Sequence, residues 1–276
     1  MKIGIIGSGV MASGIAQVFA QTEGFTVVIA SERSANAKTR LAKGFAKRIE
    51  KGKMKQDAAD AILARISNGL MADCADCDLI IESTVENLEV KKTKFKELQA
   101  IVRPDTLFAT NTSSLSITAI GAGLDRPAIG MHFFNPAPVM NLVEIIAGLN
   151  TPTEMVEKVC AIAEQIGKTP VQVNEAPGFV VNRLLIPMIN EAIGLINEGV
   201  SSPEEIDTAM KLGANHPMGP LTLGDLIGLD VVLAIMEVLQ DETGDPKYRP
   251  SPLLVKMVRG GQLGVKSSQG FFTYAK

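Results

Sequence analysis

Two glycines directly after a short apolar segment constrain this chain more than any other feature of its sequence. Lys2–Ile6 predicts a buried strand, and residues 10–21 predict a helix. The segment Gly7-Ser8-Gly9-Val10-Met11-Ala12 links this strand to the helix and includes the first three helical residues. It follows the pattern G-x-G-x-x-G/A. In a strand–turn–helix context, this pattern permits a tight turn, close approach of a pyrophosphate and close packing of helix on strand. We therefore predict a dinucleotide site formed by Gly7, Gly9, Val10 and Met11.

The end of the second predicted strand, residues 26–29, departs from this fingerprint. An acidic residue there normally bonds the adenosine ribose of the dinucleotide. This chain carries Ala30-Ser31-Glu32-Arg33, so a serine stands at the expected position. Ser31 and Arg33 could together hold a 2′-phosphate, whereas Glu32 could swing inward and let NAD bind normally. The sequence predicts a nicotinamide dinucleotide and leaves both NAD and NADP open.

Near-continuous apolar strands alternate with helices up to about residue 180. Further strands are expected at residues 79–82, 107–110, 128–131, 142–146 and 170–173, and a helical excursion is expected at residues 35–66. This alternation predicts a mostly parallel sheet covered on both faces, a Rossmann-type α/β domain. The remaining sequence has helical patterns. We therefore expect two domains, 1–180 for the dinucleotide and 181–276 as an all-helical C-terminal domain.

Three local patterns give further structural expectations. Thr151-Pro152-Thr153-Glu154 predicts a capping box with proline in the first turn of a helix. Residues 179–198 are apolar on nearly all sides, which is typical of a helix buried in a core or in a subunit interface. Phe271-Phe272-Thr273-Tyr274 is the only candidate for a strand after Pro177.

Composition excludes several classes of function. The formal net charge of −3 argues against nucleic acid as a partner. The sequence has neither an apolar run long enough for a bilayer nor a signal-peptide pattern, so we expect no membrane association. The three cysteines, Cys74, Cys77 and Cys160, suit a reducing cytoplasm. Cys74 and Cys77 lack a second pair at zinc spacing, so we expect two small apolar fillers and no metal.

Polar side chains follow several strands at the sheet edge where ligands of such folds bind. Among them is His132, and twelve residues later Glu144 lies inside an apolar strand. A buried carboxylate needs a partner, and an imidazole held by one has a fixed tautomer, as a general base for alcohol oxidation requires. Taken alone, His132 would be expected to be a core histidine, but with Glu144 available the general base is favoured. His216, the other histidine, lies in a predicted turn and is expected to be structural.

The helical excursion is strongly basic. It carries one acidic residue, Glu50, among eight cations: Lys38, Arg40, Lys43, Lys47, Arg48, Lys51, Lys53 and Lys55. Such a run is usually a solvated helix face, but it could also attract a phosphate-bearing substrate. The charges alone do not decide between these readings.

Motifs along essentially the whole chain resemble the short-chain 3-hydroxyacyl-CoA dehydrogenases. The resemblance rests on residues 7–16, Asn111-Thr112-Ser113-Ser114-Leu115-Ser116, Gly130-Met131-His132-Phe133-Phe134-Asn135-Pro136, Pro177-Gly178-Phe179-Val180-Val181-Asn182-Arg183 and Asn215-His216-Pro217-Met218-Gly219-Pro220. It implies hydride transfer between a nicotinamide cofactor and C3 of an acyl-CoA, interconverting (S)-3-hydroxyacyl-CoA and 3-ketoacyl-CoA. The short-chain family suggests a four-carbon acyl group.

The resemblance also implies roles for residues. His132 would be the general base and Glu144 its partner, while Ser113 and Asn182 would bind substrate oxygens. Cofactor contacts would come from Glu86, Lys91, Asn111, Ser113 and Asn135. Coenzyme A would lie against the helical excursion, with Lys51 and Lys55 as its contacts, and the helical domain would make a homodimer. The departures are Ala12 for the third glycine and Ser31 for the usual aspartate.

Two other functions remain compatible with the fold. One is a dinucleotide-binding protein of structural role, because a fold does not fix a function. The other is a dehydrogenase of free 3-hydroxyacids, a group that shares the glycine loop but uses a catalytic lysine. The set Ser113, His132, Glu144 and Asn182 favours the acyl-CoA dehydrogenase over both.

Overall fold

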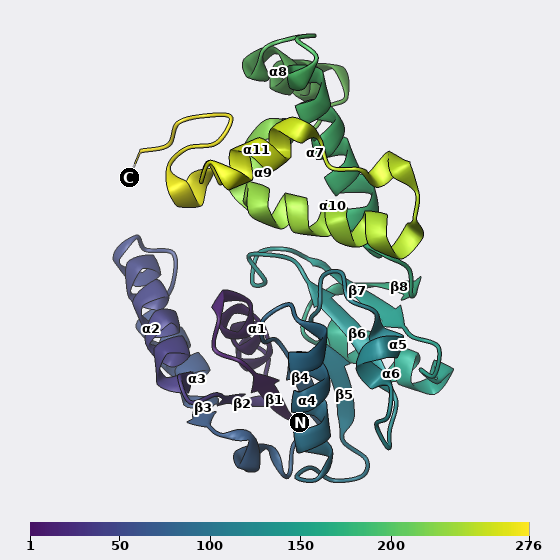
Figure 1. The fold of residues 1–276 in the computed structure, drawn as a ribbon. Coiled ribbons are helices and arrows are strands. Elements are labelled where there is room, and N and C mark those ends of the chain that lie inside the picture. Colours follow the sequence, from purple (N-terminus) through teal and green to yellow (C-terminus); the bar gives the residue numbers. More distant parts are fainter. Residues whose placement is uncertain (276) are drawn as a thin grey trace. The chain divides into compact units, whose positions relative to one another are not determined.

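The computed structural model describes residues 1–275 (Figure 1), so Lys276, the end of the expected 181–276 domain, lies outside the described residues. The chain forms two compact units, Met1–Ala176 and Pro177–Lys276. Among residues 1–275, every helix is too short or too polar to span a membrane. The first unit is built on a sheet, and the second is built of helices.

The first unit contains one eight-stranded sheet in the order β3-β2-β1-β4-β5-β6-β7-β8 (Figure 1). Its strands are β1 (Lys2–Ile6), β2 (Thr26–Ala30), β3 (Ile66–Gly69), β4 (Leu79–Glu82), β5 (Leu107–Thr110), β6 (Ala128–Phe133), β7 (Leu142–Ala147) and β8 (Thr169–Asn174). The pairing of β6 with β7 is antiparallel and the other pairings are parallel. Strand β1 lies between β2 and β4, so the strand order reverses at its carboxyl end. That reversal is where open α/β sheets bind ligands.

Helices cover both faces of this sheet. They are α1 (Val10–Gln21), α2 (Ser34–Glu50), α3 (Gln56–Ala64), α4 (Leu88–Gln99), α5 (Ile117–Gly121) and α6 (Thr153–Gln165), with a 3₁₀ turn η1 (Met71–Cys74). Neighbouring residues of β1 point to opposite faces: Ile5 joins the core under α1, α2, α3 and α6, and Ile6 joins the core under α4 and α5. Burial on both faces explains the near-continuous apolar strands.

The second unit is a helical bundle. It contains α7 (Val181–Asn197), α8 (Pro203–Gly213), α9 (Pro220–Ile227), α10 (Leu229–Thr243) and α11 (Pro252–Arg259), with 3₁₀ turns η2 (Pro246–Tyr248) and η3 (Val265–Ser267). Its core includes Ile189 and Ile193 of α7 and Met236 of α10. The buried carboxylate of Asp207 accepts hydrogen bonds from the amides of Leu221 and Thr222 at the start of α9.

The structure corrects three local expectations. The excursion at 35–66 forms two helices and then a further strand, β3, which the sequence pattern did not predict. Helix α6 has Pro152 as its N-cap without a side-chain cap, because the Thr151 hydroxyl instead donates to the Ala128 carbonyl at 2.7 Å. Residues 271–274 form only an isolated bridge, since the Phe271 and Phe272 amides donate to the Asp225 carboxylate. Leu184 of α7 is 71% exposed, so the bundle core alone does not bury this helix on all sides, and a subunit interface remains the other predicted environment.

Cys74 and Cys77 lie side by side in the core beneath β1. A methyl group added to Gly4 would lie 3.0 Å from the Cys74 Sγ and 3.3 Å from the Cys77 Sγ. Both thiols are free and fully buried, and they pack with Ile80 and Phe95. Residues 1–275 hold no cluster of three side chains with metal-ligand chemistry. The two thiols fill space, as their sequence context suggested.

Candidate active site

The glycine loop has the geometry that a dinucleotide requires. Gly7 has a φ of +125°, and a Cβ there would lie 2.4 Å from the Ser83 carbonyl oxygen, so no side chain fits at this turn. A Cβ at Gly9 would meet no atom within 4 Å and would project into open space above the start of α1. Ala12 is buried against the sheet. The loop therefore combines a tight turn with exposed amides at the amino end of a twelve-residue helix, which suits a pyrophosphate.

Replacing Gly9 with alanine is expected to separate cofactor binding from folding. Gly9 has a φ of −71°, so alanine adds no backbone strain, and its methyl group would occupy the space that a pyrophosphate needs. The Kd of the reduced dinucleotide should rise about tenfold or more, equivalent to about 1.4 kcal/mol, while the Tm of the protein alone stays unchanged. Calorimetric titration and thermal unfolding measure the two quantities. Gly7→Ala is the control, and in this variant the Tm should fall as well as the affinity. An unchanged Kd in Gly9→Ala would contradict the placement of the pyrophosphate against Gly9.

At the carboxyl end of β2, serines take the place of the usual acid. The Ser31 hydroxyl donates to the Ser8 Oγ at 3.2 Å and accepts from the Arg33 amide at 3.2 Å. Val10 is exposed at the first turn of α1, and Met11 is half-buried against the core. Glu32 is exposed.

Glu86 organises the loop that follows β5. Its Oε1 accepts hydrogen bonds from the Thr112 hydroxyl at 2.6 Å, the Ser113 amide at 2.7 Å and the Ser113 hydroxyl at 3.0 Å. Burial would raise the pKa of Glu86, but the Lys91 ammonium and these hydrogen bonds outweigh it and hold the pKa below its ordinary value. Glu86 is thus a charged anchor for Ser113, and a cofactor contact for it remains a prediction.

Behind Glu86 lies a buried ion pair. The Lys91 Nζ is 2.9 Å from the Glu82 Oε2 and 3.4 Å from the Glu86 Oε2. The Lys91 side chain is 1% exposed and that of Glu82 is fully buried, and Glu82 also accepts from the Thr84 amide and the Thr110 hydroxyl. Lys91, predicted to contact the cofactor, therefore lies beneath the site and supports Glu86. Glu82 is not among the residues predicted from the sequence, although a glutamate that ends an apolar strand indicates a buried partner.

The loops after β5 and β6 are tied together at the same sheet edge. The Asn111 Oδ1 accepts a hydrogen bond from the Phe133 amide at 2.8 Å. Asn135 is exposed just beyond β6, before a cis bond to Pro136. The contact between Asn111 and Phe133 fixes the chain directly after His132.

His132 and Glu144 form a buried pair across the antiparallel strands β6 and β7. The two residues face each other in the register, and the His132 Nδ1 lies 2.8 Å from the Glu144 Oε2. His132 is 5% exposed and Glu144 is 1% exposed. The His132 ring also contacts the Phe134 ring, with centroids 4.5 Å apart. When Nδ1 donates to the carboxylate, Nε2 carries the ring's lone pair, which is the tautomer of a general base.

The remaining predicted residues belong to other elements. Asn182 is buried in the first turn of α7, within the second unit. Lys51 and Lys55 are exposed at the end of α2 and just before α3. They lie outside a hollow of about 490 Å³ along α2, which is lined by Asn36, Thr39, Arg40, Lys43, Gly44 and Lys47.

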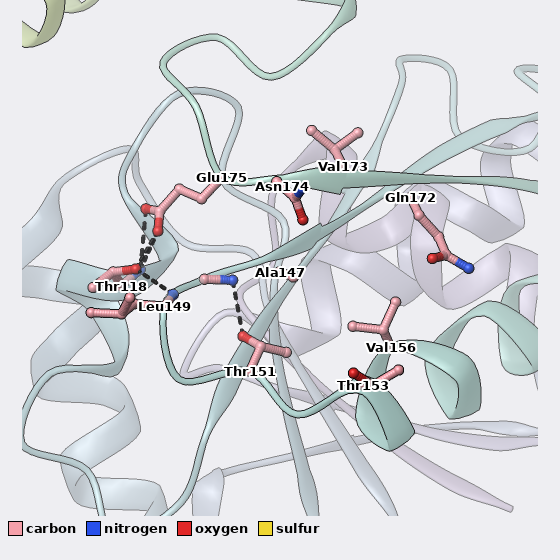
Figure 2. Close-up of a pocket in the computed structure, with 11 residues that line it drawn as sticks. Thr118, Ala147, Leu149, Thr151, Thr153, Val156, Gln172, Val173, Asn174 and Glu175 are labelled. Carbon is pink, nitrogen blue, oxygen red and sulfur yellow. Dashed lines mark hydrogen bonds between the residues drawn. The ribbon is translucent and has the colours of Figure 1, made fainter.

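A larger cavity of about 770 Å³ lies away from this edge (Figure 2). It is lined by the carboxyl ends of β7 and β8, and in the register Ala147 pairs with Ile129 near the amino end of β6. Its one charged side chain, Glu175, points to Thr118 and accepts its backbone amide at 3.2 Å. The cavity lies at the end of the sheet opposite to His132 and contains no pair of side chains suited to proton transfer. The size of a cavity therefore does not identify the candidate active site.

Comparisons with known proteins show the family to which this chain belongs. The model of the 3-hydroxyacyl-CoA dehydrogenase NAD-binding domain matches residues 2–176, and that of the 3-hydroxyacyl-CoA dehydrogenase C-terminal domain matches residues 178–274. A 3-hydroxybutyryl-CoA dehydrogenase of Clostridioides difficile is 53% identical over the full length of both chains. One from Bradyrhizobium diazoefficiens is 46% identical over 99% of this chain and 95% of its own.

A solved structure shares the fold over the whole chain. The crystal structure of (S)-3-hydroxybutyryl-CoA dehydrogenase from Ralstonia eutropha has a TM-score of 0.94 and 46% identity, covering 100% of this chain and 99% of that chain. The two family models leave almost none of the sequence unmatched. This chain is a member of the 3-hydroxyacyl-CoA dehydrogenase family of NAD-binding oxidoreductases.

Proposed function

We propose that this chain interconverts (S)-3-hydroxybutyryl-CoA and acetoacetyl-CoA, with His132 as the general acid and base. The observation that carries the proposal is the buried contact of 2.8 Å between the His132 Nδ1 and the Glu144 Oε2, at the sheet edge that also holds the glycine loop. The four-carbon substrate follows from the 3-hydroxybutyryl-CoA dehydrogenases that are 46–53% identical to this chain. A structural protein without turnover would have no use for such a pair.

The mechanism assigns the proton to His132. In the oxidative direction, the His132 Nε2 takes the proton of the 3-hydroxyl group, and the C3–O bond becomes a carbonyl as C3 loses its hydride. The nicotinamide ring, when bound, supplies the acceptor for that hydride. Glu144 holds the ring in the required tautomer and stabilises the imidazolium that forms. In the reductive direction, the imidazolium returns the proton to the oxygen.

Ser113 and Asn182 complete the proposed machinery by donating hydrogen bonds to the substrate oxygens. Preorganised donors of this kind stabilise the charge that develops on a carbonyl oxygen. Glu86 holds Ser113 through both its amide and its hydroxyl, which fixes the position of the loop. Asn182, buried at the start of α7, is the proposed donor from the helical unit.

Coenzyme A is proposed to bind along the basic face of the helical excursion. The hollow on α2 is lined by Lys43 and Lys47, and Lys51 and Lys55 are exposed in the turn between α2 and α3. Phosphates are attracted to such a cluster in a chain of net negative charge. This placement supports a thioester substrate over a free hydroxyacid.

The proposed function is tested by comparing acetoacetyl-CoA with free acetoacetate. The enzyme should oxidise a reduced nicotinamide dinucleotide when acetoacetyl-CoA is added. The kcat/KM for free acetoacetate should be lower than that for acetoacetyl-CoA by about tenfold or more. The reason is that the acetoacetate anion lacks the phosphates that the lysines attract. Absorbance at the reduced-nicotinamide band measures both rates. Absence of turnover at high enzyme concentration would favour the structural role, and equal rates would favour a free-acid dehydrogenase.

A homodimer through the helical unit and a cytoplasmic location complete the proposal. Leu184 of α7 and Leu226 of α9 are large apolar side chains that are 71% and 58% exposed, as expected of a surface that a partner covers. The molar mass in solution, measured by light scattering, tests the dimer. The odd number of cysteines supports a reducing compartment.

A further inference from the structure

The carboxyl end of β2 carries hydroxyl groups where NAD-specific sites carry a carboxylate. Ser31 occupies the position that normally bonds the adenosine ribose, and its hydroxyl contacts the Ser8 Oγ at 3.2 Å. A carboxylate at this position accepts a hydrogen bond from the ribose 2′-hydroxyl and repels a 2′-phosphate. In this chain two serine hydroxyls lie there instead, and the Arg33 amide donates to the Ser31 Oγ, so no carboxylate occupies this position. The local chemistry therefore permits an anion at the 2′ position.

An arginine from α2 is fixed against the same loop. The Arg40 Nη1 donates to the Ser8 carbonyl at 3.0 Å, the Gly9 carbonyl at 3.1 Å and the Ser13 Oγ at 2.9 Å. All three contacts use one nitrogen, and none of them uses Nε or Nη2. A guanidinium held by one nitrogen in this way presents its charge and further N–H groups beside the glycine loop, and its planar fork is well suited to phosphate.

The charge balance at this end of the loop is positive. Arg33 is exposed at the start of α2, Arg40 lies about two turns further along the helix, and Glu32 is the acidic residue between Ser31 and Arg33. Two arginines and two serine hydroxyls are the groups that commonly bind a phosphate monoester. We propose that Ser8, Ser31, Arg33 and Arg40 form a site for the 2′-phosphate, so that this chain uses NADP(H) in preference to NAD(H).

The first test measures binding alone and does not depend on the proposed reaction. Adenosine 2′,5′-bisphosphate should bind at least about tenfold more tightly than 5′-AMP in calorimetric titration, the difference expected of one charge-assisted hydrogen bond. Ser31→Asp should abolish this difference, and Arg33→Ala should reduce it. Lys96→Ala, which removes an exposed charge from α4, is the matched control and should leave it unchanged. Adenosine 3′,5′-bisphosphate distinguishes this site from the hollow along α2. Ser31→Asp should weaken the binding of the 2′,5′-bisphosphate and leave the binding of the 3′,5′-bisphosphate unchanged.

The second test measures turnover and rests on the proposed function. With acetoacetyl-CoA, kcat/KM should be higher for NADPH than for NADH by about tenfold, and Ser31→Asp should reverse the order. A ratio at or below one in the unaltered protein, or a ratio that Ser31→Asp does not change, overturns the inference. Tight binding of adenosine 2′,5′-bisphosphate without turnover of either dinucleotide would uphold the inference and refute the proposed function. If Glu32→Gln lowers kcat/KM for NADH while NADPH is the poorer cofactor, Glu32 has replaced the missing aspartate and the inference is wrong.

Discussion

Replacement of His132 with glutamine is expected to lower kcat for acetoacetyl-CoA by about 10²–10⁴-fold, the usual contribution of a general acid or base. Glutamine can still hydrogen-bond to Glu144, but its amide neither accepts nor donates a proton at neutral pH. The Kd of the dinucleotide should stay within about twofold, because the glycine loop is untouched. Steady-state rates and calorimetric titration measure the two effects.

The matched control is His216→Gln. His216 is the other histidine of the chain and is half-buried between α8 and α9, so its replacement should leave kcat within about twofold. The kcat of Glu144→Gln should lie between those of His132→Gln and His216→Gln. The glutamine amide oxygen can still orient the imidazole, but it carries no charge to stabilise the protonated ring. A His132→Gln variant that turns over at the unaltered rate would remove His132 from the mechanism.

Replacement of Lys91 with methionine is expected to lower the free energy of unfolding by about 3–5 kcal/mol, the usual cost of removing one partner from a buried ion pair. Methionine keeps the apolar stem of lysine and removes the ammonium that lies 2.9 Å from the Glu82 Oε2. Glu82 is then left in the core with hydroxyl and amide donors alone and without a cation beside it. Chemical denaturation measures the change as a shift of the midpoint at constant m-value.

Lys94→Met provides the comparison on the same helix. Lys94 forms an exposed pair with Glu97 at 2.8 Å, and exposed pairs contribute about 0–1 kcal/mol. Adding Glu82→Gln to Lys91→Met should restore part of the lost stability, because it removes the uncompensated charge. Equal destabilisation by Lys91→Met and Lys94→Met would show that the buried pair has no special role in the fold.

Local sequence patterns were sufficient to predict the parts of this protein that depend on periodicity and on turn chemistry. Apolar runs predicted most strands of the sheet, and the pattern around Gly7 and Gly9 predicted the turn into α1. The contact of His132 with Glu144 could be predicted because a carboxylate inside an apolar strand needs a partner, and the antiparallel register supplies it. The catalytic role of the pair remains a proposal.

Contacts between distant segments could not be predicted in this way. The Arg40 guanidinium reaches the Ser8 carbonyl across 32 residues of sequence, and nothing in the spacing of a basic helix shows which cation turns toward the loop. Lys91 has the sequence context of an exposed helix, yet the Glu82 carboxylate draws it into the core. Asp225 binds the amides of Phe271 and Phe272, which prevents the predicted terminal strand. In each case, a single polar partner outweighs the local pattern.

The central claim is that His132 exchanges a proton with the C3 oxygen of the substrate. A crystal structure of this chain with acetoacetyl-CoA and the oxidised dinucleotide tests it most directly, through the distance from the His132 Nε2 to the 3-oxo oxygen. If His132 is the general acid and base, this distance should be about 2.6–3.2 Å, the range in which a proton is transferred directly. An oxygen held by a different proton donor, with His132 outside hydrogen-bonding reach, would contradict it.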